Sequence, residues 1–101
     1  MMTLTTTKHD TFADALLDAT AHDDHRGVCG NWVALHQGDE VTIFEAGRHY
    51  VTLTQRADAW DITDVSYDIP TGAIATLNTA LYRIECAYRL TATIPVQRIR
   101  T

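Results

Sequence analysis

The sequence predicts an α+β fold made of an N-terminal helix, a four-stranded antiparallel meander and a long C-terminal amphipathic helix. Two observations support this class. Apolar residues recur with the helical period over residues 8–22 and again over residues 71–90. Between these segments, four short runs rich in β-branched and aromatic residues are separated by turn residues.

The C-terminal helix is the most strongly periodic segment of the chain. Pro70 precedes it, and Thr71 is a suitable N-cap residue. The helix cannot continue through Pro95, and the threonines before that proline favour a strand, so residues 91–99 are a candidate terminal edge strand. The apolar stripe of the helix consists of Ala73, Ile74, Leu77, Ala80, Leu81, Ile84, Ala87 and Tyr88.

The first helix is predicted to begin at Lys8 and to end near His22. Thr7 and Asp10 have the spacing of a capping box, although aspartate is shorter than the usual glutamate. Residues 1–7 are expected to be flexible, with a short edge strand as the alternative. One face of this helix carries Phe12, Ala15, Leu16 and Ala19.

The middle of the chain is predicted to form the meander. Residues 22–30 combine two glycines with several charges and are interpreted as a loop. Connections of two to five residues join the strands that follow, which favours antiparallel pairing. The four predicted strands span residues 31–36, 40–46, 49–54 and 59–65.

The length and composition indicate one globular domain that spans residues 1–101. The first residues lack the basic and apolar regions of a signal peptide, and no segment has the roughly 20 apolar residues of a membrane span, so we expect a cytoplasmic protein. Cys29 and Cys86 match no metal-binding pattern and are interpreted as reduced thiols, with a disulfide as the alternative.

The charge is unevenly distributed along the chain. The net charge is −5, and residues 1–70 hold twelve acidic side chains against four lysines and arginines. Residues 71–101 hold one acidic side chain against four arginines. An acidic protein repels nucleic-acid phosphates, so direct nucleic-acid binding is not expected, whereas a larger protein with a basic surface is a suitable partner.

Aspartates recur where helix and strand propensities disfavour them. One interpretation is a solvated surface. The other is an electronegative face that docks into a basic groove of a partner protein. In that case, the predicted contact residues are Asp10, Asp14, Asp18, Asp61, Asp64 and Asp68.

No catalytic motif, cofactor-binding motif or phosphate loop is present in the sequence. The spacing of His22, His25 and Cys29 permits a metal site on a loop, although it matches no established zinc module. A small metal-binding protein or enzyme that uses these three residues is therefore one alternative function.

In size, charge and lack of motifs, the chain resembles the small phage-encoded inhibitors of restriction or CRISPR systems. This resemblance implies a non-enzymatic protein that blocks a basic nucleic-acid-binding surface of a larger protein. The remaining alternative is a homo-oligomeric assembly protein, in which the long helix or the edge strand forms the contact of a homodimer.

Overall fold

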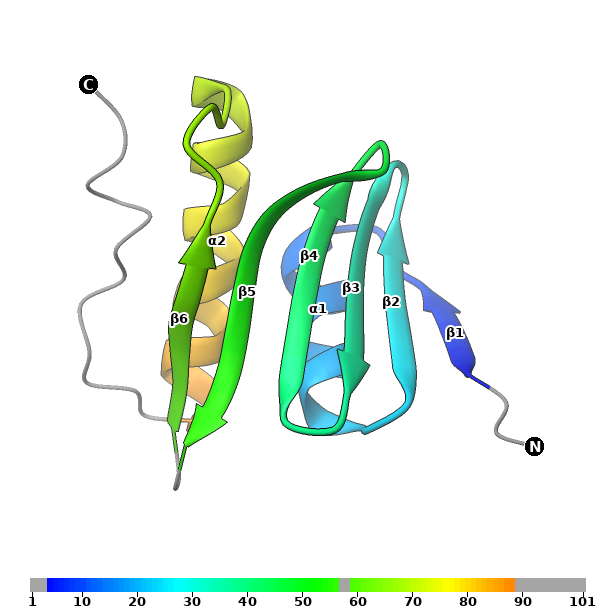
Figure 1. The fold of residues 1–101 in the computed structure, drawn as a ribbon. Coiled ribbons are helices and arrows are strands. Elements are labelled where there is room, and N and C mark those ends of the chain that lie inside the picture. Colours follow the sequence, from blue (N-terminus) through cyan, green and yellow to red (C-terminus); the bar gives the residue numbers. More distant parts are fainter. Residues whose placement is uncertain (1–3, 57–58, 89–101) are drawn as a thin grey trace.

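The computed structural model describes residues 4–56 and 59–88, which form two helices and a six-stranded mixed sheet (Figure 1). The α+β class is therefore confirmed. The predicted sheet of four antiparallel strands is too small, because the sheet has six strands and one of its pairs is parallel. In chain order the elements are β1 (Thr5–Lys8), α1 (Phe12–Ala21), β2 (His25–Cys29), β3 (Trp32–Gln37), β4 (Glu40–Glu45), β5 (Arg48–Arg56), β6 (Ala59–Val65) and α2 (Thr71–Tyr88).

The strands lie in the sheet in the same order as in the chain, from β1 at one edge to β6 at the other. The pair β1–β2 is parallel and is connected through α1, whereas each later pair is antiparallel and is connected by a short turn. Both helices lie against the same face of the sheet, with α1 behind β2 and β3 and α2 behind β5 and β6 (Figure 1). The fold thus has two layers.

The predicted loop at residues 22–30 is wrong for residues 25–29, which form β2, an internal strand of the sheet next to the edge strand β1. The glycine that suggested a loop has a packing role. A Cβ atom at Gly27 would lie 2.1 Å from the carbonyl oxygen of Ala15, so only glycine lets α1 approach β2 this closely. Within the sheet, β2 pairs with β1. This is the short edge strand that the sequence offered as the alternative to flexible N-terminal residues.

The first helix begins later than the sequence predicts. Its N-cap is Thr11, whose hydroxyl accepts a hydrogen bond from the backbone N–H of Asp14 at 3.2 Å. Thr7, the predicted capping residue, instead lies in β1. The prediction failed here because two Thr-x-x-Asp spacings follow one another, at Thr7 and at Thr11, and the first of them is used for sheet pairing.

The long helix α2 matches its predicted start at Thr71 and continues to Tyr88. The candidate edge strand at residues 91–99 lies outside the described residues. Within the described part of the chain, neither helix is both long and apolar enough to cross a membrane. The buried residues of α2 are Ile74, Leu77, Ala80, Leu81 and Ile84, all members of the predicted stripe.

The core lies between the sheet and the two helices. Leu16 of α1 and Leu77 of α2 are fully buried there, together with Ile43 and Leu53 of the sheet. Removing each such side chain from water contributes about 1.5–3 kcal/mol before conformational entropy is counted. The α1–α2 contact is closed at its surface by an ion pair of Arg83 with Asp14 at 3.0 Å.

Candidate functional site

The six aspartates predicted to bind a partner lie in two groups, one near the β1 edge of the sheet and the other near the β6 edge. Asp14 and Asp18 belong to α1, which packs on β2 and β3, and Asp10 immediately precedes this helix. Asp61 and Asp64 belong to the opposite edge strand β6, and Asp68 lies between β6 and α2. The structure therefore does not bring the six carboxylates together on one face.

Most of these carboxylates also contact basic side chains of the same molecule. Besides the pair of Asp14 with Arg83, the carboxylate of Asp68 accepts a hydrogen bond from Arg48 at 2.6 Å. Two looser pairs join Asp61 to Arg56 at 3.9 Å and Asp64 to His49 at 3.8 Å. Such exposed pairs contribute at most about 1 kcal/mol each, but they reduce the field that the aspartates present to a partner.

Asp18 is the centre of a polar cluster formed by Thr7, His9, Asp18 and His25. A single carboxylate oxygen, Oδ2, accepts a hydrogen bond from the hydroxyl of Thr7 at 2.7 Å, and it lies 2.9 Å and 3.1 Å from Nε2 of His9 and His25. An ionised carboxylate only accepts hydrogen bonds, so both Nε2 atoms carry a hydrogen in this arrangement. The cluster ties β1, α1 and β2 together.

These contacts favour the ionised form of Asp18. The hydrogen bond from Thr7, followed by those from His9 and His25 and the charge of His25, lowers the pKa of Asp18 from 3.8 to about 2, although burial acts in the opposite direction. A carboxylate this well satisfied by its own chain is a structural link. Its Oδ2 has little capacity left for a partner, whereas Oδ1 has only a loose contact with Nε2 of His22 at 3.8 Å.

The structure does not bring His22, His25 and Cys29 together as metal ligands. The imidazole rings of His22 and His25 are 5.6 Å apart between centroids, but Cys29 lies at the other end of β2, about 13 Å from His25 along an extended strand. Its thiol contacts the carbonyl of Asp10 at 3.5 Å instead. Among the described residues, no group of three or more histidine, cysteine, aspartate or glutamate side chains is arranged to hold a metal ion.

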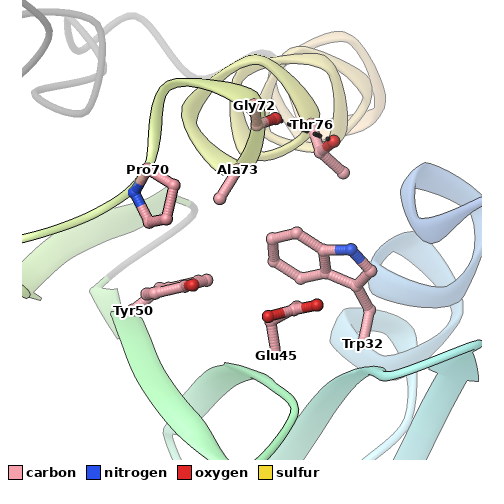
Figure 2. A pocket seen from close by; sticks show the side chains of 7 residues that line it. All are labelled: Trp32, Glu45, Tyr50, Pro70, Gly72, Ala73 and Thr76. Carbon is pink, nitrogen blue, oxygen red and sulfur yellow. Dashed lines mark hydrogen bonds between the residues drawn. The ribbon is translucent and has the colours of Figure 1, made fainter.

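A pocket of about 300 Å³ opens between the sheet and the first turns of α2 (Figure 2). Three strands supply its polar and aromatic side. Trp32 begins β3, Glu45 ends β4 and Tyr50 lies near the start of β5. The opposite wall is formed by Pro70, Gly72, Ala73 and Thr76.

Strand pairing and a bulge bring the three sheet residues together. Trp32 and Glu45 are direct partners in the β3–β4 ladder. The β4–β5 ladder shifts register beside Phe44, which pairs with His49, and Tyr50 then turns to the side that carries Trp32. The rings of Trp32 and Tyr50 are 5.7 Å apart between centroids, and the Glu45 side chain lies between them in Figure 2.

Glu45 is half-buried, and among the described residues its carboxylate forms neither an ion pair nor a hydrogen bond. Its cross-strand partner Arg48 would be the expected counterion. The guanidinium of Arg48, however, binds Asp68 and lies 5.9 Å from the ring centre of Tyr50. Glu45 therefore brings an uncompensated negative charge to an aromatic pocket.

The sequence contains little that distinguishes this site. Glu45 is one of several acids in the predicted meander, and nothing local separates it from Glu40 five residues earlier. Trp32 is half-buried and stacks on Phe12 at 4.8 Å between ring centroids, whereas Trp60 is buried in the core. Only the turn from β4 into β5 and the position of α2 create the pocket.

Comparisons of this chain with protein-family models, with curated proteins and with solved structures find no match.

Proposed function

We propose that this chain is a non-enzymatic binding module, and that its pocket at Glu45 receives a positively charged side chain of a larger partner protein. The uncompensated carboxylate of Glu45 between Trp32 and Tyr50 is the observation that carries this proposal. In this proposal, the pocket at Glu45 makes the main contact with the basic surface of the partner. The six dispersed aspartates act as a background field of the same sign.

The chemistry of the pocket suits an alkylammonium or guanidinium group. Aromatic faces attract cations through the ring quadrupole, by about 0.5–2 kcal/mol depending on desolvation. A carboxylate adds a charge-assisted hydrogen bond, which is stronger than a neutral one. The apolar wall formed by Pro70 and Ala73 suits the aliphatic stem of lysine or arginine.

The guanidinium of Arg48, which is paired with Asp68, lies 5.9 Å from the ring centre of Tyr50 and opposes a second cation there. The N-terminal end of α2 is the other local charge that opposes a cation. It is equivalent to about half a positive charge, whereas Glu45 carries a full negative charge. The carboxylate also stabilises the helix end by about 0.3–1 kcal/mol, which is a structural role that needs no ligand. Both roles are compatible, because no donor among the described residues occupies the carboxylate.

The partner is a larger protein that exposes a basic surface. An inhibitor of a nucleic-acid-handling complex is one version, since proteins that bind phosphates expose lysine and arginine side chains. In this version affinity falls with rising salt, because the net charge of −5 acts over a screening length of about 8–10 Å. A local aromatic contact predicts a shallower salt dependence than six exposed carboxylates acting together.

The pocket can be tested without knowing the partner. We would titrate isotope-labelled protein with capped lysine, capped arginine and tetramethylammonium, and follow backbone amide shifts by NMR. We expect saturable shifts around Trp32, Glu45 and Tyr50, with dissociation constants above about 1 mM because each probe makes few contacts. A capped glutamate at the same concentration should not produce them.

Glu45→Gln is the decisive variant, and Glu40→Gln is its matched control on the same strand with the same change of charge. The first should abolish the shifts and the second should leave them in place. Equal weakening by both variants would favour a diffuse acidic surface. Shifts that survive Glu45→Gln would refute the pocket as the binding site.

A further inference from the structure

The face of the sheet that points away from α1 and α2 carries a compact apolar group. Val28, Val33, Leu35 and Phe44 alternate along their strands with the buried residues of the opposite face, such as Gly27, Ala34 and Ile43, and are themselves partly exposed. We call this face the outer face. Antiparallel sheets with one solvated face usually place polar residues there, so four large apolar side chains in one group are unusual for a free surface.

The strand registers show that these side chains are neighbours. Val28, Val33 and Phe44 occupy one row across β2, β3 and β4, and Leu35 lies two residues further along β3, opposite Thr42. Directly opposite side chains are about 4.5–5.5 Å apart between Cβ atoms, and diagonal neighbours such as Leu35 and Val28 are about 7–8 Å apart, within reach of long side chains. The group therefore forms one contiguous patch rather than scattered exposed residues.

Opposite charges flank this patch. On one side, Lys8 of β1 pairs in register with Val28, and Arg26 of β2 pairs with Leu35. On the other side, Asp64 and Asp61 of β6 pair with threonines 52 and 54 of β5. Within the described residues, neither Lys8 nor Arg26 forms an ion pair, and both aspartates make only loose, exposed ones.

We propose that the outer face is the interface of a homodimer in which two copies of this chain pack face to face. A twofold axis parallel to the strands, between β3 and β4, places Val33 of one copy opposite Phe44 of the other. The same axis brings Arg26 over β5 and next to Asp64, and it does so twice because of the symmetry. A basic edge and an acidic edge on one face are self-complementary in this arrangement.

The size of the face sets the expected strength. Five interstrand spacings of about 4.8 Å and strands of about five residues give a face of about 24 by 17 Å, or ~400 Å² of projected area per copy. The two copies together cover about 800 Å² of projected area, less than the roughly 1,200–2,000 Å² of standard specific interfaces. The dimer is therefore a weak, transient one, and we expect a dissociation constant of about 10–500 μM. The aligned packing of two twisted sheets, at about 30°, accommodates the geometry.

The experiment is sedimentation velocity on the full chain from about 10 μM to 1 mM, a range that brackets the expected constant. The unmodified protein should shift from monomer to dimer. Arg26→Asp and Asp64→Arg should each weaken association by at least about tenfold, because each places like charges opposite one another. The double variant restores the complementary pairs and should recover dimerisation.

Two controls separate the interface from stability and from the pocket. Asp10→Lys changes the charge away from the outer face and should leave association unchanged, as should Glu45→Gln on the helix-covered side. The thermal unfolding midpoint of each variant, measured at low concentration, identifies any that fails to fold. A protein that stays monomeric at all concentrations overturns the proposal. So does a dimer whose dissociation constant is unchanged by Arg26→Asp and Asp64→Arg, or one that the double variant does not restore.

Discussion

Replacing Asp18 by asparagine tests whether the cluster of Thr7, His9, Asp18 and His25 holds β1 and β2 to α1. The carboxylate oxygen Oδ2 is within 3.1 Å of three donor atoms, and an amide in its place has a weaker acceptor oxygen and a competing N–H₂ group. We therefore expect Asp18→Asn to fold with the same secondary structure and a lower free energy of unfolding at neutral pH.

The magnitude follows from the pKa of Asp18. A fall from 3.8 to about 2 corresponds to roughly 2 kcal/mol at about 1.4 kcal/mol per unit, and the 26% exposure of the side chain reduces this to about 1–2 kcal/mol. The folded-state pKa is lower than the unfolded one. The contribution is therefore present above about pH 4 and is lost as the pH falls towards 2.

The assay is urea unfolding of both proteins at several pH values between about 2 and 7. The difference between wild type and Asp18→Asn should be about 1–2 kcal/mol at pH 7 and should shrink towards zero near pH 2. Asp10→Asn is the control, because Asp10 is exposed and forms no ion pair within the described residues. A difference between wild type and Asp18→Asn that is the same at pH 7 and pH 2 would refute the assigned role of the charge.

Three further changes test the packing, the turns and the surface charges. Gly27→Ala should lower the free energy of unfolding by more than about 2 kcal/mol, because its Cβ would lie 2.1 Å from the backbone of Ala15. Gly72→Ala is the control and should not lower it, because no atom lies within 4 Å of the added Cβ. Ala46 has a φ of +51° in the β4–β5 turn, so Ala46→Asn should raise the melting temperature by the equivalent of about 0.5–1 kcal/mol. A double-mutant cycle on Arg83 and Asp14, both about half exposed, should give a coupling below about 1 kcal/mol.

Several elements could be predicted because their signal is local. The stripe of α2 repeats every three or four residues from Ile74 to Ile84, and only a helix puts such positions on one face. The strands β3 to β6 lie within one or two residues of the predicted runs because short turns interrupt β-branched and aromatic segments. Hairpin pairing then follows from the length of the connections.

The strand β2 could not be predicted in this way. Its sequence His25–Cys29 has a glycine at its centre and no clean alternation, so the local pattern is that of a loop. What makes it a strand is β3 on one side, β1 on the other and α1 above Gly27. Pairing with a distant segment satisfies its backbone groups, and this information lies in the partners.

The sequence by itself determined the α+β class, the net negative charge and the position of the long helix, because each depends on composition or on the spacing of neighbours. The tertiary structure alone decided which charges are compensated. It directs Arg48 to Asp68 and leaves Glu45 between two aromatic rings. The physical reason is that an ion pair depends on distances of a few ångströms between side chains far apart in the chain, and no local period encodes those distances.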